Sequence, residues 1–380
     1  MAHLTREEVV ASGVVSEEFR KAFTARPLNI AASTFHETRA QRAAHLQRLR
    51  HLYPIPGPIP DEVVETMYDV PMRDGETIQV RVYQPAKGEP EGGSPLVMMY
   101  HEGGWCMGDL TDEDLNCRMF ARELGAVCVN VGYRYVFFFF STFHPPLFQT
   151  YIHLKIHKAT NSIFEPTKQK RLAPEHKFPT GIHDSWDALT WALANSTTLL
   201  RATPTRGLIV GGSSAGGNIA AVLALLARDT NLSPPITGQY LSVPVLLPST
   251  NVPAHLSHLY TSRRDNVFDP VLHPFDDADD GPASLAGIYA PVRESPLWDP
   301  FNHHDGHKGV ARAFFQVCGM DPLRDEAVLY DARLREAGVL TRFELYHGVG
   351  HMFWTNWPEF ERSREFVRDT LKGVRWLLEA

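Results

Sequence analysis

Cysteine is scarce in this sequence, and the few that occur are not arranged as a disulfide framework or a zinc site. The 380 residues include four cysteines, at positions 106, 117, 128 and 318, and none forms a C-x-x-C pair. Disulfide-stapled domains are short and rich in cysteine, and structural zinc sites take closely spaced ligands. We therefore expect buried thiols, a reducing compartment and no metal.

An excess of positive charge and a long apolar run are also missing. Lys and Arg number 37 against 44 Asp and Glu, which gives a net charge of −7. A mildly acidic chain has no electrostatic footprint for nucleic acid or anionic membranes. The aromatic run at 136–140 falls far short of the roughly 20 apolar residues that span a bilayer.

The first eight residues contain no apolar stretch of the kind that directs secretion. From these absences we expect a cytoplasmic protein, monomeric or homodimeric, with no nucleic-acid partner and no stable membrane insertion. The composition, 43% hydrophobic and 21% charged, is that of an ordinary globular protein.

The N-terminal part of the chain differs from the rest. Residues 1–60 combine helical spacing with many charges and end in a proline-rich stretch, which stops any helix. Residues 64–83 then alternate between apolar and polar around the turn at 73–75, which predicts an antiparallel hairpin. We expect N-terminal helices over 1–60 and one main domain over 61–380.

Beyond the hairpin, short apolar runs alternate with helical patterns. The runs lie at 96–100, 127–131, 208–210, 240–243, 314–317 and 343–346. The helical patterns lie at 112–124, 182–195, 215–228, 324–337 and 358–378. This alternation predicts an α/β fold, with a mostly parallel sheet covered by helices on both faces. Residues 248–298, rich in Asp, Pro, His and Ser, interrupt the rhythm and are expected to form a cap or insertion.

A nucleophile motif follows the run at 208–210. Gly212-x-Ser214-x-Gly216 stands between that strand and a good helix, which is the context that gives G-x-S-x-G its meaning. A serine on so tight a turn is exposed in strained backbone geometry, and the two glycines leave room for the chain. The alternative is a glycine-rich turn with a serine helix cap. Ser213 is the competing serine, but it lacks glycine at both offsets.

A serine nucleophile needs a base, which a carboxylate orients. Asp321 follows the predicted strand at 314–317, and His351 lies in a glycine-flanked loop after the last strand. This order of serine, acid and histidine is that of α/β-hydrolases. Asp321 has an alternative reading as a helix cap, and His347 is the rival base. Asp325 and Glu326 are expected to be first-turn charges of the next helix.

A pair of glycines, Gly103 and Gly104, follows the strand at 96–100 and allows backbone amides to approach a substrate closely. This glycine loop, taken together with the serine, acid and histidine motifs, makes the sequence similar to a known family. The chain resembles the hormone-sensitive-lipase-like α/β-hydrolases, also called the α/β-hydrolase fold-3 group, whose members share five short motifs. Their counterparts here are His101-Glu-Gly-Gly104, Leu172-Ala-Pro-Glu-His176, Gly212-Ser-Ser-Ala-Gly-Gly217, Asp321-Pro-Leu-Arg-Asp-Glu326 and Gly350-His-Met-Phe353.

The resemblance covers roughly residues 60–380 and implies an α/β-hydrolase fold with a helical cap, made by the N-terminal segment and 248–298. It implies Ser214 as nucleophile, Asp321 as the orienting acid and His351 as base. It also implies that the amides of Gly103, Gly104 and Ala215 form the oxyanion hole.

Two residues depart from the family pattern. Glu102 replaces the first glycine of the H-G-G-G motif, where a carboxylate can either repel anionic substrates or tighten the loop through a local hydrogen bond. Ser213 replaces the usual Asp beside the nucleophile, a change that we expect to be mild.

A third departure is an insertion. In the family, the motif Tyr-Arg-Leu-Ala-Pro-Glu-His is continuous. In this sequence, residues 135–171 separate Arg134 from Leu172. The segment contains no glycine and shows no sustained helical or strand period. Its ends can be encoded by codons that resemble splice signals. One hypothesis is therefore a retained intron that is translated in frame, and the rival is a genuine loop.

These features predict a serine carboxylesterase that hydrolyses short-acyl esters of small molecules through an acyl-enzyme, with no metal or cofactor. A secondary-metabolite or xenobiotic ester is the substrate that the resemblance suggests. Two alternatives stay open on the same fold: a non-catalytic small-molecule receptor, and a lyase or dehydratase.

Overall fold

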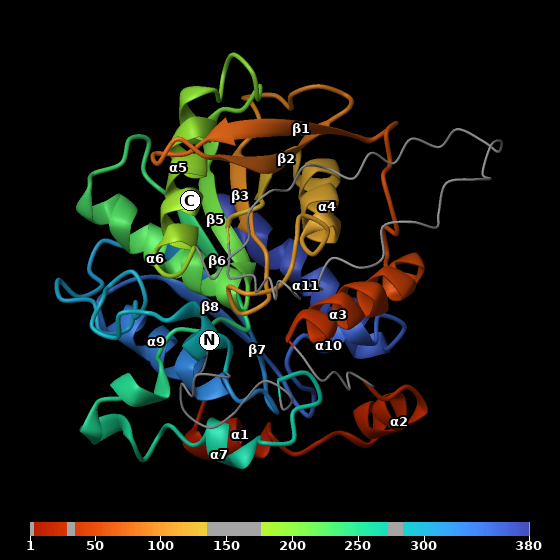
Figure 1. The fold of residues 1–380 in the computed structure, drawn as a ribbon, viewed down its shortest axis with the longest axis vertical. Helices are drawn as coiled ribbons and strands as arrows, with labels where there is room; N and C mark the ends of the chain where they lie inside the picture. Colours follow the sequence, from red (N-terminus) through yellow and green to blue (C-terminus); the bar gives the residue numbers. More distant parts are fainter. Residues whose placement is uncertain (1–3, 29–34, 135–175, 273–283, 380) are drawn as a thin grey trace, which may run out of the picture.

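A computed structural model describes residues 4–28, 35–134, 176–272 and 284–379 (Figure 1). The predicted insertion at 135–171, and Leu172 to Glu175 of the interrupted motif, lie outside the described residues. The predicted α/β-hydrolase architecture is confirmed, because the described part of the chain forms an eight-stranded, mostly parallel sheet with helices on both faces.

The sheet has the order β1-β2-β4-β3-β5-β6-β7-β8. Its strands are β1 (Val63–Pro71), β2 (Thr77–Pro85), β3 (Leu96–Tyr100), β4 (Val127–Val131), β5 (Leu208–Ser213), β6 (Gly238–Ser242), β7 (Arg312–Cys318) and β8 (Thr341–Tyr346). β1 and β2 form the predicted hairpin, and β2 runs antiparallel to β4. All other neighbours are parallel, so the carboxyl ends of β3, β5, β7 and β8 meet at one edge.

The buried side chains divide into two clusters, one on each face of the sheet. In β3, Leu96, Met98 and Tyr100 belong to one cluster, and Val97 and Met99 belong to the other. This alternation follows from the period of two along a strand. Because both faces are buried, the strands are continuous apolar runs, which is the pattern that made them recognisable in the sequence.

Helices α5, α6 and α9 cover one face of the sheet, and α4 and α11 cover the other (Figure 1). The helices are α1 (Arg6–Ala11), α2 (Glu17–Ala25), α3 (Phe35–Leu49), α4 (Asp114–Leu124), α5 (Thr180–Ala194), α6 (Ala215–Asp229), α7 (Ser262–Asp265), α8 (Leu285–Tyr289), α9 (Arg324–Glu336), α10 (Phe353–Asn356) and α11 (Glu361–Leu378). The five helices expected from periodicity are present, each shifted by three residues or fewer. None of the described helices is both long enough and apolar enough to cross a membrane.

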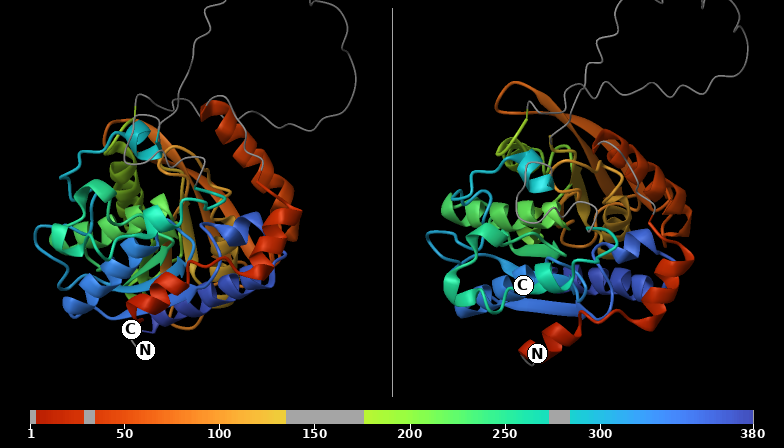
Figure 2. Two further views of the ribbon diagram at one scale, coloured as in Figure 1. Left: turned by 90° about the horizontal axis from the view of Figure 1, so that it is seen from below. Right: turned by 60° about the horizontal axis from the view of Figure 1, so that its bottom comes forward.

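The N-terminal helices lie along one side of the domain and α3 reaches the edge where the parallel strands end (Figure 2). Backbone bonds fasten the start of the chain to the loop after β8: Ser16 N donates to Gly348 O at 3.0 Å, and Gly348 N donates to Ser12 O at 2.8 Å. Phe19 of α2 is buried against Trp357, with ring centroids 5.1 Å apart. The N-terminal segment therefore packs on the loop that carries His351.

Asp325 and Glu326 lie in the first turn of α9, as expected. Both are also fully buried and bind other segments of the chain. Asp325 Oδ2 accepts from the amides of Thr261 and Ser262, and Glu326 Oε2 accepts from those of Leu246 and Leu247. Satisfying these donors offsets the cost of burying the carboxylates, so both residues fix the 246–262 segment against α9.

Candidate active site

Ser214 stands on the sharp turn between β5 and α6. Its backbone has φ 54° and ψ −116°, a strained conformation for a residue with a side chain. A Cβ atom on Gly212 or Gly216 would overlap with the carbonyl oxygen of Tyr100 on the neighbouring strand. Both glycines are therefore required for this turn to pack against β3, and the turn presents the Ser214 hydroxyl at the carboxyl edge of the sheet.

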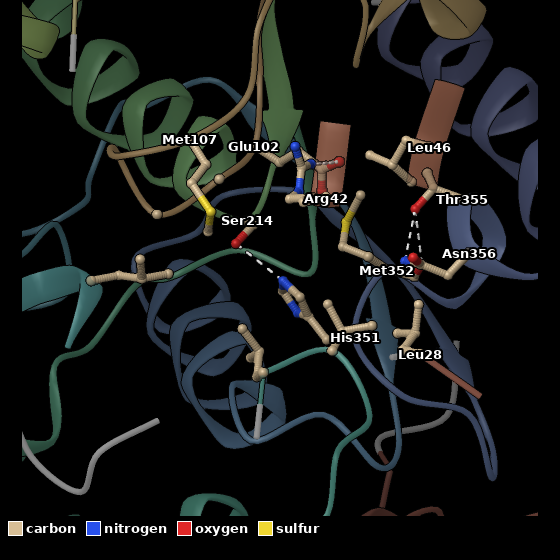
Figure 3. A pocket seen from close by; sticks show the side chains of 15 residues that line it. Leu28, Arg42, Leu46, Glu102, Met107, Ser214, His351, Met352, Thr355 and Asn356 are labelled. Carbon is tan, nitrogen blue, oxygen red and sulfur yellow. Dashed lines mark hydrogen bonds and ion pairs between the residues drawn. The ribbon is translucent and has the colours of Figure 1, made fainter. Parts of the chain in front are cut away.

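Three side chains that are far apart in the sequence meet at that edge. His351 Nε2 lies 3.1 Å from Ser214 Oγ, and His351 Nδ1 lies 2.7 Å from Asp321 Oδ2. Figure 3 shows the Ser214 hydroxyl directed at the His351 ring. All three residues are buried. The second oxygen of Asp321 accepts from the Leu323 amide at 2.8 Å, so the carboxylate caps the turn before α9 and also binds the histidine.

The electrostatic surroundings of His351 favour its protonated form. Burial lowers the pKa of the imidazole, but the hydrogen-bonded Asp321 carboxylate, Asp269 and Glu102 together outweigh that effect. The pKa of His351 consequently lies above its ordinary value of 6.5. Such an environment stabilises the cation that forms when the ring accepts a proton.

The glycine loop after β3 lies beside the Ser214 hydroxyl. Gly103 and Gly104 line one cavity with Ser214 and His351, and both have positive φ, 113° and 59°. The ring of His101 stacks on Tyr133 at a centroid distance of 4.1 Å, and the Tyr133 hydroxyl donates to His101 O at 2.8 Å. These contacts fix the backbone from which the predicted oxyanion donors project. Ala215, the third predicted donor, is the first residue of α6.

Glu102 takes part in a buried ion pair. Arg42 of α3 donates to Glu102 Oε1 at 2.6 Å, and its other terminal nitrogen lies 3.5 Å from Asp112 Oδ2. Burial raises the pKa of Glu102 to about 7, although Arg42 opposes the rise. Two effects were considered for Glu102: repulsion of anionic substrates and tightening of the loop through a hydrogen bond. The structure contains a bond of the second kind, and its donor is Arg42, 60 positions away in α3.

The cavity over Ser214 has mostly apolar walls and a volume of about 540 Å³, including its open mouth (Figure 3). Leu28 and Leu46 come from the N-terminal segment, and Val271, Leu272 and Leu285 come from the 248–298 segment. Arg42 and Glu102 supply charge on one side, and Thr355 and Asn356 form a polar end. A site of this kind accommodates a small, largely apolar molecule with one reacting polar group.

The rivals considered in the sequence are placed elsewhere. Ser213 is the last residue of β5 and is buried, and His347 is exposed to solvent. Two residues near the site were missed by sequence reasoning: Arg42, and Asp269, which accepts a hydrogen bond from His351 N at 2.6 Å. Neither residue belongs to a recognisable motif. An isolated charged residue in a polar segment is most often solvated, so the sequence contained no signal that either one would be buried at the site.

Comparison with known proteins agrees with this geometry. Residues 97–135 and 169–355 match a family model described as the alpha/beta hydrolase fold. The chain belongs to the α/β-hydrolase family. The predicted place in the hormone-sensitive-lipase-like group is confirmed, and the predicted enzyme class, a carboxylic ester hydrolase, agrees with its relatives. The part between the two matched ranges falls within the predicted insertion.

Three similar proteins illustrate the relationship. An AB hydrolase superfamily protein of Schizosaccharomyces pombe is 33% identical over 325 residues, 84% of this chain and 82% of that protein. Versiconal hemiacetal acetate esterase of Dothistroma septosporum is 29% identical over 313 residues, 82% and 81% of the two chains. The crystal structure of vibralactone cyclase superposes with a TM-score of 0.80 at 26% identity, and 97% of this chain and 96% of that one are covered.

Proposed function

We propose that this α/β-hydrolase is a serine carboxylesterase that acts on short-acyl esters of small molecules. The observation that carries the proposal is the continuous contact from Ser214 Oγ through the His351 ring to Asp321. The apolar cavity above Ser214 supports a small acyl group, and the acetate esterase among the relatives supports an acetyl ester.

In the proposed reaction, Ser214 Oγ attacks the ester carbonyl carbon while its proton passes to His351 Nε2. The negative charge that develops on the carbonyl oxygen is stabilised by the amides of Gly103, Gly104 and Ala215. Asp321 stabilises the imidazolium, which then protonates the departing alcohol. Water, deprotonated by His351, attacks the acyl-serine and releases the acid.

We further propose that residues 1–60 and 248–298 together form the cap of the acyl site. Leu28 and Leu46 on one side, with Val271 and Leu272 on the other, support this division, because they enclose the same cavity from two remote segments.

The test is hydrolysis of p-nitrophenyl acetate, butyrate and octanoate, together with labelling by an organophosphate. We expect kcat/KM to be highest for acetate or butyrate and to fall for octanoate. Ser214→Ala and His351→Ala should lower kcat by about 10,000-fold or more, and Ser214→Ala should abolish labelling.

A matched control lies close to each residue in the chain. Ser213→Ala should still be labelled, and His347→Ala should hydrolyse acetate at the normal rate, since its ring faces solvent. Labelling that survives in Ser214→Ala would contradict the proposal. A receptor would bind ester without hydrolysis or labelling, and a lyase would release an alkene instead of an acid and an alcohol.

A further inference from the structure

Asp269 is a buried carboxylate that no motif singles out, and in the described part of the chain it accepts hydrogen bonds from three backbone amides. Oδ2 accepts from His351 N at 2.6 Å, and Oδ1 accepts from Val271 N at 2.9 Å and Leu272 N at 2.8 Å. The side chain has no solvent exposure. A buried carboxylate that receives three charge-assisted bonds holds the groups around it firmly.

The three bonds connect the base to the wall of the cavity. Val271 and Leu272 line the cavity over Ser214, and their amides and the His351 amide point to the same carboxyl group. A Cβ atom on Gly350 would overlap with Asp269 Oδ2, so the glycine before the histidine is what admits the carboxylate. The position of the His351 backbone thus depends on Asp269.

The same segment also contacts the loop of the acid. Asn266 Nδ2 donates to Gly319 O and to Asp321 O, both at 3.0 Å. Residues 266–272 therefore contact the loop that carries Asp321 and the loop that carries His351, and they contribute to the cavity wall. We propose that Asp269 is a positioning residue, which keeps the His351 ring between Asp321 and Ser214 and stabilises its cationic form.

The charges that face His351 are few. Asp321 binds its ring, Asp269 binds its amide, and Glu102, paired with Arg42, faces it from the loop after β3. Burial and the neighbouring Asp321 raise the pKa of Asp269 to about 7. Asp269 contacts the amide of His351 and not the ring, so it acts through position at any pH and through charge only above about pH 7, where its carboxyl is ionised.

This inference rests on the proposed esterase reaction, and Asp269→Asn tests it. Asparagine keeps the volume but removes the charge and turns a donor toward one of the three amides. We expect kcat for p-nitrophenyl acetate to fall about tenfold with KM within about twofold. Removing the charge, which Asp269 carries fully only above about pH 7, should lower the pKa of His351, so the acid limb of kcat/KM should move to lower pH by at most about half a unit.

Asp299→Asn is the matched control. Asp299 is also a buried carboxylate, but its partners are Asn251 and Asn302, outside the groups described above. This variant should leave kcat and the acid limb unchanged. Equal losses in both variants with no movement of the acid limb would overturn the proposal, because they would indicate a general loss of stability.

A second pair of variants does not depend on how well Asp269→Asn folds. Gly350→Ala should lower kcat, since the added methyl group displaces the Asp269 carboxylate. The double variant with Asp269→Ala should be no worse than Asp269→Ala alone, because the overlap is gone. Additive losses would contradict a direct coupling between the two positions.

A titration that needs no catalysis separates this inference from the esterase proposal. NMR of histidine-labelled protein, with the signal assigned by its loss in His351→Ala, reports the pKa of His351 directly. It should be lower in Asp269→Asn than in Asp299→Asn. If the wild-type protein hydrolyses no ester and is not labelled, the proposed function fails, and an unchanged His351 pKa in Asp269→Asn refutes the role of Asp269 independently.

Discussion

At the scale of single residues, the site is defined by buried carboxylates arranged around one imidazole. Asp321, Asp269 and Glu102 all favour the protonated form of His351, against the effect of burial. In the proposed reaction this balance determines the pH at which His351 can act as base, because only a neutral ring can accept the proton of Ser214.

The first prediction is the pH dependence of the wild-type enzyme. A pKa of His351 above 6.5 in the free enzyme means that kcat/KM rises with pH through that value and is lost below it. We expect the midpoint of the acid limb for p-nitrophenyl acetate to lie above pH 6.5. A midpoint below that value would show that burial outweighs the three carboxylates.

The second prediction concerns the Glu102–Arg42 ion pair. Glu102→Gln removes the charge that fastens the oxyanion loop to α3, so we expect kcat for acetate esters to fall about tenfold. The control is Glu65→Gln, which weakens the Arg118–Glu65 pair, also 2.6 Å long but formed between α4 and β1. Glu65→Gln should leave kcat unchanged; if both variants lose activity alike, the loop is not the target of the effect.

The third prediction is also made at the residue scale. Asp321→Asn should lower kcat by about 10,000-fold, because the amide can no longer stabilise the imidazolium or select the correct tautomer. Steady-state hydrolysis measures the loss. Circular dichroism should show an intact fold, since the amide oxygen can still accept from the Leu323 amide. Near-normal kcat would contradict the orienting role of Asp321.

At the scale of elements, the short helix α2 connects the N-terminal segment to the catalytic loop. Its Phe19 is 1% exposed and packs against Trp357, which follows α10. The neighbouring Phe23 contacts the same indole but is 36% exposed. The two phenylalanines therefore share a helix and a partner and differ mainly in burial.

The fourth prediction compares these two positions. Phe19→Ala should reduce the free energy of unfolding by about 3 kcal/mol or more, through lost burial and an internal cavity. Phe23→Ala should cost less, about 1 kcal/mol, because 36% of the residue is already in contact with water. Urea unfolding followed by fluorescence measures both. Equal costs would show that α2 does not depend on its buried face.

At the scale of the whole molecule, the unusual feature is the segment at 135–171, which separates two parts of a motif that is continuous in the family. The family model matches residues up to 135 and again from 169, so the segment interrupts an otherwise continuous family pattern. Its apolar run at 136–140 is an aggregation hazard wherever it is exposed.

The fifth prediction follows from the retained-intron hypothesis. Deleting 135–171, which joins Arg134 to Leu172, should raise soluble yield and specific activity, and spliced transcripts should lack the segment. A variant with serine at 137–140 is the control: it should recover yield if the apolar run alone is responsible. Mature transcripts that retain the segment, or a deletion without gain, would favour a genuine loop.

Most of the fold, and the candidate residues Ser214, Asp321 and His351, could be predicted because the signal for each lies in the adjacent sequence. Buried strands are short apolar runs, and Ser214, Asp321 and His351 each directly follow such a run or its turn. The buried roles of Asp325 and Glu326 could not be predicted, because first-turn acids of a helix usually face solvent and their partners lie more than 60 positions away.

The sequence by itself determined the order of strands and helices, the strained serine turn and the glycine loop, since local periodicity and backbone sterics depend on adjacent residues. Only the tertiary structure decided that Arg42 pairs with Glu102 across 60 positions and that Asp269 binds the amide of His351 across 82. Whether a charged side chain is solvated or buried against a partner depends on which distant loops come together at the edge of the sheet. The residues next to it in the sequence do not determine that contact.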